Sequence, residues 1–537
     1  NYTISDGQNK TGNNAKFVRE FWEVKNQDVG KNKKWLFYAK GGGYRKWYGN
    51  ISEVVDWSID ARGFYKKDKI CRIIPEYLWY KVGITWSLIS NNPSFRFLPV
   101  DSTFDVGGSS VFLNDDNKLY YILGLLNSKL FDYVQKIINP TINIQVKDVR
   151  IMPFIQREKE CVNDLVQVCF QYSRADWNSY ETSWDFSVHP LVKTANSLRK
   201  NNELTTMANH YQLWVSECES RFHQLKANEE ELNRIFIDIY GLQDELTPDV
   251  ADKDITIHRI FDSKEDVPES MKGSAYIRTK KDEIVSLLSY FIGCMFGRYS
   301  LDTEGLAYAG GEWDETKYKR FKPDADNIIP ITDEEYLEDD IISRLCEWLK
   351  VVYGEETLEV NLDFIAEALG NKGSTSREVI RNYFLNDFFK DHCQTYSVTG
   401  SGKRPIYWLF DSGKQNGFKA LIYLHRYNAD TIGNLRIDYL HRMQRIYESE
   451  INRMQDTINN STNAREVAAA TKRKEKLTKQ LKECREYDEK IAHLALSRIE
   501  LDLDDGVKVN YKKLQTGVDG KFYEVLADSK NIMIKDK

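Results

Sequence analysis

Between residues 436 and 499, apolar residues recur every three or four positions in two stretches that a polar run separates. The first stretch contains Ile437, Leu440, Met443, Tyr447, Ile451, Met454 and Ile458, and the second contains Ala470, Leu477, Leu481, Cys484, Tyr487, Ile491 and Leu494. The intervening Asn459–Asn463 reads Asn-Asn-Ser-Thr-Asn, a composition that favours a turn. This spacing puts one apolar stripe on each of two helices. We therefore expect an antiparallel coiled-coil hairpin whose dense Lys, Arg and Glu face solvent.

A chain of 537 residues is long enough for three or four domains, at roughly 100–200 residues per domain. We expect the α+β class, with a mixed, strand-rich module at 1–157, a helical connector at 158–247, an α-rich domain with small β elements at 248–430, the hairpin at 431–500 and a tail at 501–537. Within the first module, apolar spacing predicts one helix over Lys118–Ile137 and a strand-like return over Thr141–Pro153. In the connector, Asp176 is expected to cap a helix.

Composition excludes several classes of protein. No run of about 18 apolar residues occurs, and the best candidate, Ile284–Met295, is short with polar flanks, so we expect no membrane span. The start of the chain has neither a basic nor an apolar segment typical of a signal peptide. The eight cysteines are scattered without Cys-x-x-Cys spacing, which favours free thiols in a reducing cytosol over a disulfide framework or a zinc site.

The formal net charge of −6 is unevenly distributed along the chain. Residues 1–150 contain 22 Lys and Arg against 15 Asp and Glu, a net charge of +7, so the remainder carries −13. A basic first module on an acidic remainder is typical of a domain that faces nucleic acid. Ordinary variation of surface charge between domains is the alternative.

No pattern for catalysis, cofactor binding or metal binding is found. Phe104–Ser110 contains a Gly-Gly pair, but no strand–loop–helix unit surrounds it, and Asn91–Phe95 lacks the second proline of an Asn-Pro-Pro-aromatic methyltransferase loop. The acidic run Asp333–Asp340 lies at a predicted helix start, where the helix dipole favours carboxylates without a metal. We assign no catalytic, cofactor-binding or metal-ligating residue.

Several basic, polar and glycine-rich positions in the first module fit contacts with DNA. In Lys40–Gly49, glycines allow backbone N–H groups to approach phosphates, cations add charge, and aromatic rings can stack on bases. Asn and Gln side chains can bond adenine edges, and Asn143, Gln145 and Lys147 would share one face of the expected strand. The candidate DNA-binding residues are Lys10, Thr11, Asn13, Lys16, Arg19, Lys40, Gly41, Gly42, Gly43, Tyr44, Arg45, Lys46, Trp47, Thr85, Ser87, Asn143, Gln145 and Lys147. The alternative is a solvated strand face and aromatic rings that belong to the core.

Particular segments resemble a known family. Lys10–Phe17, Phe21–Val24, Leu125–Lys129 and Asp148–Pro153 resemble the target-recognition domains of large adenine methyltransferases. Six further segments resemble the PglX family, the adenine-specific DNA methyltransferases of BREX (bacteriophage exclusion) systems: Lys40–Asn50, Gly83–Ser87, Glu181–Leu191, Asn228–Leu246, Gly293–Leu301 and Phe418–Tyr427. The resemblance weakens only after about residue 500.

The resemblance implies that 1–157 is a target-recognition domain and that the chain is the C-terminal half of a methyltransferase. The full-length family protein uses S-adenosylmethionine to methylate adenine N6, marks host DNA and is needed for phage defence. Its catalytic domain, with an Asn-Pro-Pro-Tyr loop, precedes the region that matches this chain. We therefore expect a fragment that needs no cofactor, is inactive alone and recognises and clamps DNA.

The expected partners are double-stranded DNA and other BREX defence proteins, in the bacterial cytoplasm. Charge alone adds acidic phage proteins that mimic DNA, because a basic cleft shaped for a duplex attracts them as well. The alternative function is a protein–protein scaffold that assembles the phage-exclusion complex, with little DNA contact beyond residue 157.

Overall fold

The computed structural model describes residues 3–199 and 205–534, and the chain divides into two compact units. The first unit comprises Asn1–Thr194 and Asn209–Glu283, and the second comprises Ala195–Ala208 and Ile284–Lys537. Both units combine helices with small sheets, so the expected mixture of α and β structure is confirmed. The predicted domain boundaries stay predictions, although the core of the first unit runs without interruption from Trp47 to Met271 and so passes residue 157.

Two four-stranded sheets form the N-terminal part of the first unit. One sheet has the order β1-β8-β5-β6, all antiparallel, from Thr3–Ile4, Ser110–Leu113, Gly83–Trp86 and Phe95–Leu98. The other has the order β2-β4-β3-β7, from Val18–Glu20, Glu53–Asp56, Trp35–Ala39 and Ser102–Phe104, and its β3–β7 pair is parallel. The short helix α1 (Asn14–Phe17) precedes β2, and α2 (Ile59–Lys67) follows β4.

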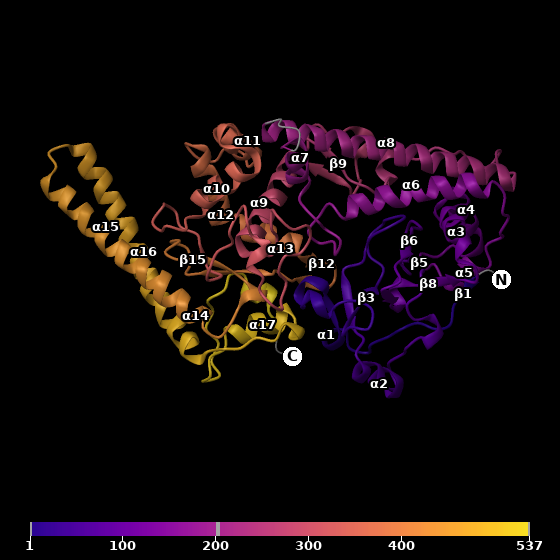
Figure 1. Cartoon of the computed structure of the whole chain (residues 1–537), viewed down its shortest axis with the longest axis horizontal. Coiled ribbons are helices and arrows are strands. Elements are labelled where there is room, and N and C mark those ends of the chain that lie inside the picture. Colours follow the sequence, from indigo (N-terminus) through magenta and orange to yellow (C-terminus); the bar gives the residue numbers. More distant parts are fainter. Residues whose placement is uncertain (1–2, 200–204, 535–537) are drawn as a thin grey trace. The chain divides into compact units, whose positions relative to one another are not determined.

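Helices complete the first unit. They are α3 (Leu119–Asn127), α4 (Lys129–Ile138), α5 (Val146–Arg150), α6 (Lys159–Trp177), most of α8 (Met207–Tyr240) and the start of α7 (Pro190–Arg199). In Figure 1, α6 and α8 run side by side, and their buried Val166, Phe222 and Phe236 share one core with the β5–β6 hairpin. Gly124 lets α3 approach α6 closely, because a Cβ at this position would lie 2.7 Å from Val166 Cγ2. A parallel pair, β9 (Arg259–Phe261) and β10 (Ile277–Thr279), follows.

Two predictions for residues 118–153 were wrong in detail. The expected single helix is interrupted at Ser128, whose backbone is extended and whose hydroxyl donates to the carbonyl of Leu125 at 2.6 Å, so α3 and α4 are separate helices. The expected strand over 141–153 is absent from these described residues, which instead contain α5. Gln145 begins α5 because its N–H donates to Asp148 Oδ2 at 2.9 Å in a capping box. Helical geometry therefore removes the shared strand face of Gln145 and Lys147.

The second unit contains a three-stranded antiparallel sheet with the order β11-β15-β14, from Ile329–Pro330, Lys419–Tyr423 and Tyr407–Asp411. The helices around it are most of α9 (Lys280–Phe296), α10 (Ile341–Tyr353), α11 (Leu358–Ala368), α12 (Ser376–Asn386) and α13 (Phe388–Thr395). A small hairpin, β12 (Ser397–Val398) with β13 (Gly402–Lys403), follows α13. Helix α10 ends at Gly354, where φ of 104° suits a residue without a side chain.

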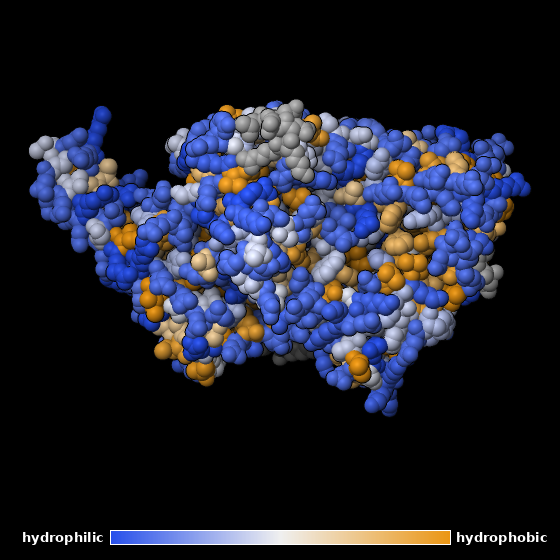
Figure 2. Space-filling model, in the orientation of Figure 1, coloured by the Kyte–Doolittle hydropathy of each residue, from blue (hydrophilic) through white to orange (hydrophobic). Residues whose placement is uncertain are grey.

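Two long helices, α15 (His441–Asn460) and α16 (Ala464–Ser497), pack against each other after the short α14 (Thr431–Asn434). They confirm the predicted pair of helices with a polar turn, whereas the coiled-coil character stays a prediction. Figure 1 shows the turn at the far end of the pair, and Figure 2 shows a largely hydrophilic surface there. Residues 451–469, which we call the hairpin tip, contain no buried residue.

The other end of α16 belongs to the core of the second unit. Glu483 accepts hydrogen bonds from Ser412 Oγ at 2.7 Å and from the N–H groups of Gln415 and Gly417 at 2.8 and 3.0 Å. Tyr487 donates to the carbonyl of Val525 at 2.7 Å. The tail, with α17 (Val507–Leu514) and α18 (Ser529–Ile532), is therefore folded onto the unit despite its weak sequence pattern.

Within the described residues, no helix is both long and apolar enough to cross a membrane. None of the eight cysteines forms a disulfide, and six of them are buried: Cys71, Cys169, Cys218, Cys294, Cys393 and Cys484.

Replacing Asn452–Ala469 by a short Asn-Gly turn should change the free energy of unfolding of the second unit by less than about 1 kcal/mol, because none of these residues is fully buried. The matched comparison is Leu494→Ala, at a fully buried position of the same helix, which should cost about 2–5 kcal/mol. Chemical denaturation measures both. A loss above 2 kcal/mol in the truncated chain would mean that the tip contributes to the packed core.

Candidate functional site

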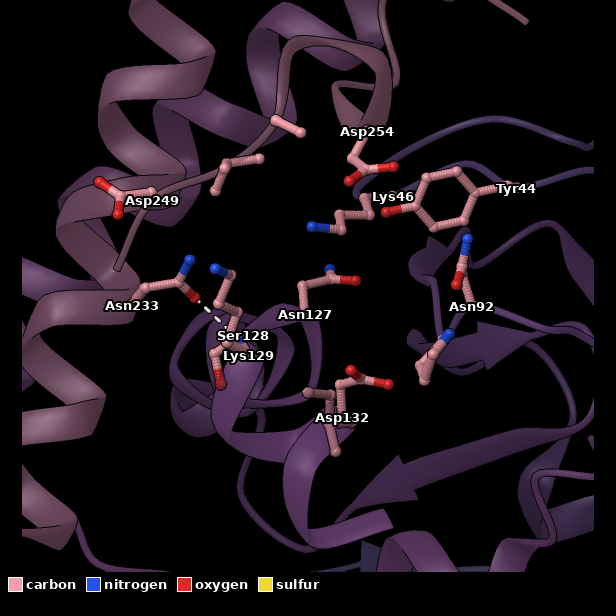
Figure 3. Close-up of a pocket in the computed structure, with 14 residues that line it drawn as sticks. Tyr44, Lys46, Asn92, Asn127, Ser128, Lys129, Asp132, Asn233, Asp249 and Asp254 are labelled. Atoms are coloured by element: carbon pink, nitrogen blue, oxygen red, sulfur yellow. Dashed lines mark hydrogen bonds between the residues drawn. The ribbon is translucent and has the colours of Figure 1, made fainter. Parts of the chain in front are cut away.

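A pocket of about 470 Å³ opens on the first unit where four segments meet (Figure 3). The first follows the glycine run Gly41–Gly43, the second precedes β6, the third is the junction of α3 and α4, and the fourth is α8 with the chain after it. The lining residues are Tyr44, Lys46, Asn92, Pro93, Leu126, Asn127, Ser128, Lys129, Asp132, Asn233, Asp249, Val250, Ala251 and Asp254. Two of them, Tyr44 and Lys46, are among the predicted DNA-binding residues.

The backbone conformation and close packing of the glycine run require glycine at its first two positions. Gly41 and Gly42 have φ of +95° and +112°, and a Cβ would lie 2.8 Å from the carbonyl oxygen of Gly107 at the first position and 2.8 Å from the Asn50 side chain at the second. The hydroxyl of Ser87 donates to the carbonyl of Gly42 at 2.9 Å. Gly43, by contrast, has open space around it.

Arg96 binds the backbone of the glycine run, a role that the sequence did not reveal. Its guanidinium is buried and donates to the carbonyls of Arg45 at 3.1 Å and Gly41 at 3.3 Å. Burial, helped by the charge of Arg45, lowers the pKa of Arg96 to about 10.

Arg45 turns into the protein, away from solvent. Its Nη2 lies 3.1 Å from Asp176 Oδ2, its Nε donates to the carbonyl of Tyr48 at 2.6 Å, and the residue is 1% exposed. Asp176, expected as a helix cap, instead lies in the last turn of α6 and also accepts the N–H of His258 at 2.9 Å. Burial acts to raise the pKa of Asp176, but the charge and hydrogen bonds of His258, together with Arg45, outweigh it and hold this pKa well below its usual range.

Lys46 is held by a carboxylate on α8. Its Nζ lies 2.9 Å from Glu229 Oε2, and Oε1 of the same carboxylate accepts the indole N–H of Trp47 at 2.8 Å. Burial alone would lower the pKa of Lys46, yet Glu229 and neighbouring groups raise it above its ordinary value. The lysine is therefore charged and already neutralised by a partner within the protein.

The junction of α3 and α4 joins the pocket to distant parts of the unit. The buried Asn127 amide accepts from the N–H of Phe95 at 2.9 Å and donates to its carbonyl at 3.0 Å. The N–H of Lys129 donates to Asn233 Oδ1 at 2.9 Å, and Asn233 Nδ2 donates to the carbonyl of Pro248 at 2.9 Å. Leu125–Lys129, one of the segments that carry the family resemblance, therefore connects the α3–α4 junction with β6 and with α8.

The chemistry of the pocket does not suit a phosphate. Figure 3 shows Lys46 and Asp254 across the cavity from Asn127, Ser128 and Asp132. The carboxylates of Asp132, Asp249 and Asp254 outnumber the ammonium groups of Lys46 and Lys129, and Lys46 is already paired. Among the residues that the structure describes, no group of three or more His, Cys, Asp or Glu could hold a metal ion.

The second glycine pair, Gly107-Gly108, does not form a cofactor loop. It leads into β8 and not into a helix, and a Cβ on Gly108 would lie 2.2 Å from the carbonyl oxygen of Ala39. The pair thus serves close packing against β3, and its surroundings do not fit S-adenosylmethionine.

The remaining predicted residues divide by burial. Arg19, whose Nη1 donates to the carbonyls of Ala15 at 2.8 Å and Val18 at 2.7 Å, is buried, as are Thr11, Thr85 and Ser87. Lys40 is half-buried, 3.7 Å from Glu53 Oε1, and Asn143 is also half-buried. The exposed positions are Lys10, Asn13, Lys16, Gly42, Gly43, Gln145 and Lys147.

Arg19, Arg45 and Lys46 are therefore buried and present no exposed charge to a phosphate. The sequence did not reveal Asp176 and Glu229, which pair with Arg45 and Lys46, or Arg96, which donates to the backbone of the glycine run. Glu229 lies in the segment Asn228–Leu246, which carries part of the family resemblance. That resemblance singled out the segment but did not indicate that Glu229 pairs with Lys46.

No family model matches the chain. It is homologous to two adenine-specific methyltransferases. It is 41% identical over 524 residues to PglX of Lacticaseibacillus casei (strain Zhang), covering 94% of this chain and 41% of the relative. It is 36% identical over 547 residues to BrxX of Escherichia coli O9:H4 (strain HS), covering 98% of this chain and 43% of the relative. The chain thus spans less than half the length of either relative.

Removing either partner of the Arg45–Asp176 pair should destabilise the first unit by about 3–5 kcal/mol, because an unpaired charge would remain buried. Denaturant unfolding of Arg45→Met, Asp176→Asn and the double variant measures the effect. The double variant should lose clearly less than the sum of the single losses. Strict additivity would contradict coupling between the two side chains.

The stabilisation from Asp176 should also depend on pH. Because its pKa is lower in the folded state than the ordinary value of about 4, the contribution is complete above pH 4 and is lost as the pH falls towards the folded pKa. The stability difference between the native chain and Asp176→Asn should therefore shrink as the pH falls from 5 to 3. A difference that grows on acidification below pH 5 would contradict the assignment.

Proposed function

We propose that this chain is the DNA-recognition and clamping part of a BREX-type adenine-N6 DNA methyltransferase that marks host DNA and is needed for phage defence. One observation carries the proposal: the chain matches adenine-specific methyltransferases over 94% and 98% of its own length, yet spans only 41% and 43% of theirs. In this proposal, the domain that binds S-adenosylmethionine lies outside the chain. No residue here is assigned to catalysis or to the cofactor.

The charge distribution supports DNA as the partner of the first unit. Residues 1–150 carry the net charge of +7, and Lys10, Lys16 and Lys147 are exposed without an ion pair in the described part of the chain. These cations would position the duplex through its phosphates. Exposed Asn13 and Gln145, with the half-buried Asn143, are the polar side chains proposed to select the sequence.

The buried ion pairs have a different role in this proposal. Arg45 and Lys46 tie the glycine run to α6 and α8, so the loop that carries exposed Gly42 and Gly43 has a fixed place. A fixed surface lowers the entropy lost on binding and helps to place a flipped adenine in a separate catalytic domain.

Duplex binding by this chain should be steeply salt-dependent. With at least three phosphate contacts, the slope of log K against log salt is about −2.7 or steeper, so affinity should fall at least about 40-fold between 50 and 200 mM salt. Fluorescence anisotropy measures this with a randomised duplex and with the sequence that the full-length enzyme methylates in cells. Preference for the methylated sequence would place readout in this chain, whereas absence of binding at 50 mM salt would overturn the proposal.

A scaffold that assembles the phage-exclusion complex is the second candidate, and the hairpin tip favours it. No residue of the tip is buried, and the chain beyond residue 150 is acidic, which suits protein partners better than DNA.

The chain lacking Asn452–Ala469 separates the two functions. If the tip binds protein partners, co-purification of the defence proteins with the truncated full-length enzyme should fall at least tenfold, while DNA affinity stays within twofold. Loss of DNA affinity with intact assembly would instead make the tip part of the clamp.

A further inference from the structure

A basic surface with exposed apolar side chains lies at the edge of the first unit. It is formed by Lys10–Phe17, by α2 and by Asp68–Arg72, and we call it the α2 knob. Figure 1 shows α2 at the margin of the first unit, and Figure 2 shows orange apolar atoms among blue hydrophilic ones at the same place. Only Lys10, Thr11, Asn13 and Lys16 of this surface were predicted from the sequence.

The three segments of the knob are fixed to one another. Lys10 and Arg72 exchange two backbone hydrogen bonds of 2.9 Å, and the Cys71 thiol donates to the carbonyl of Thr11 at 3.0 Å. Beneath them, Phe17 and Tyr65 pack in one buried cluster with Cys71. The surface therefore presents its charges from a defined backbone.

Cations outnumber carboxylates on the knob. The seven cations are Lys10, Lys16, Arg62, Lys66, Lys67, Lys69 and Arg72, and the carboxylates on the same segments are Asp60 and Asp68. Within the described residues, only Lys66 of the seven has an ion-pair partner, Glu76 at 2.9 Å. Asp68 accepts the N–H groups of Ile70 and Cys71, which lowers its pKa.

Three large apolar side chains are exposed among these cations: Ile59 at 79%, Phe64 at 43% and Ile70 at 60%. Lys16 Nζ lies 5.3 Å from the centre of the Phe64 ring, so a cation and an exposed apolar ring adjoin there. Exposed lysines beside a few apolar groups match a surface of alternating phosphates and deoxyribose rings. A stable protein partner would require a larger apolar centre with fewer lysines.

We propose that the α2 knob binds the sugar–phosphate backbone of a DNA duplex, with Lys10, Lys16, Lys67, Lys69 and Arg72 on the phosphates and Ile59, Phe64 and Ile70 against the sugars. This inference rests on the proposed DNA recognition and assigns its main electrostatic contact to a surface apart from the glycine run, whose Arg45 and Lys46 are paired internally.

The test compares two triple variants that remove the same charge from the first unit. The knob variant is Lys10→Gln, Lys67→Gln and Lys69→Gln, and the control is Lys159→Gln, Lys253→Gln and Lys264→Gln, at exposed lysines without ion pairs in the described residues. All six side chains are on the surface, so both variants should fold, which circular dichroism and thermal unfolding verify. Anisotropy with a randomised duplex gives affinity and salt slope.

The knob variant should lose at least tenfold in affinity at 100 mM salt, and its slope should become shallower by about 2.7, the value for three lost phosphate contacts. The control should change the slope by less than 1. Equal effects in both variants would show that binding follows net charge and would overturn the knob while leaving DNA recognition in place. Absence of duplex binding by the native chain would overturn both proposals.

A second pair of measurements tests the apolar contact and the competing class of partner. Ile59→Ser with Ile70→Ser should weaken duplex binding at least threefold without changing the salt slope, because no charge is removed. An unchanged affinity would overturn the contact with sugars. Native duplex binding by the knob variant, together with lost binding of an acidic defence or phage protein, would assign the surface to a protein and overturn the proposal.

Discussion

The first unit depends on a carboxylate buried at the end of α6. Asp176 accepts a hydrogen bond from the guanidinium of Arg45, which lies in the loop after β3. It also accepts one from the backbone N–H of His258, in the segment that follows α8. Three stretches of chain, distant in sequence, therefore meet at one charge that water does not reach. Such an arrangement is costly to break, because removing one partner leaves the others charged and desolvated. The place of the glycine run, and with it one wall of the pocket, follows from this contact.

Much of the helical structure could be predicted because it depends on local signals. The spacing of Tyr447, Leu481 and Ile491 indicates two long helices, since this feature requires only apolar periodicity along the chain. The break at Ser128 and the start of α5 at Gln145 were missed. In both cases, a side-chain hydrogen bond to the backbone overrides the average pattern.

The candidate site could be predicted only in part, for a different reason. The sequence shows that Arg45 and Lys46 are basic and lie beside glycines, which is equally compatible with a phosphate and with a buried carboxylate. Their partners Asp176 and Glu229 lie 131 and 183 residues away, and no local pattern carries that information. Exposed cations such as Lys67 and Lys69 escaped notice because nothing in their spacing distinguishes them from solvated surface. The two cations beside the glycines are therefore buried, whereas Lys67 and Lys69 are exposed.

The anchoring of α16 has a mechanical consequence. A helix of 34 residues is about 50 Å long, and α16 contacts the rest of the second unit from Arg473 onward. Arg473 pairs with Glu334 at 2.8 Å, Glu483 accepts hydrogen bonds from the loop between β14 and β15, and Tyr487 donates to the tail. A molecule that pulls or twists the hairpin tip would therefore transmit force along α16 first to Glu334, on the segment that leads into α10, and then to Ser412 and Gly417.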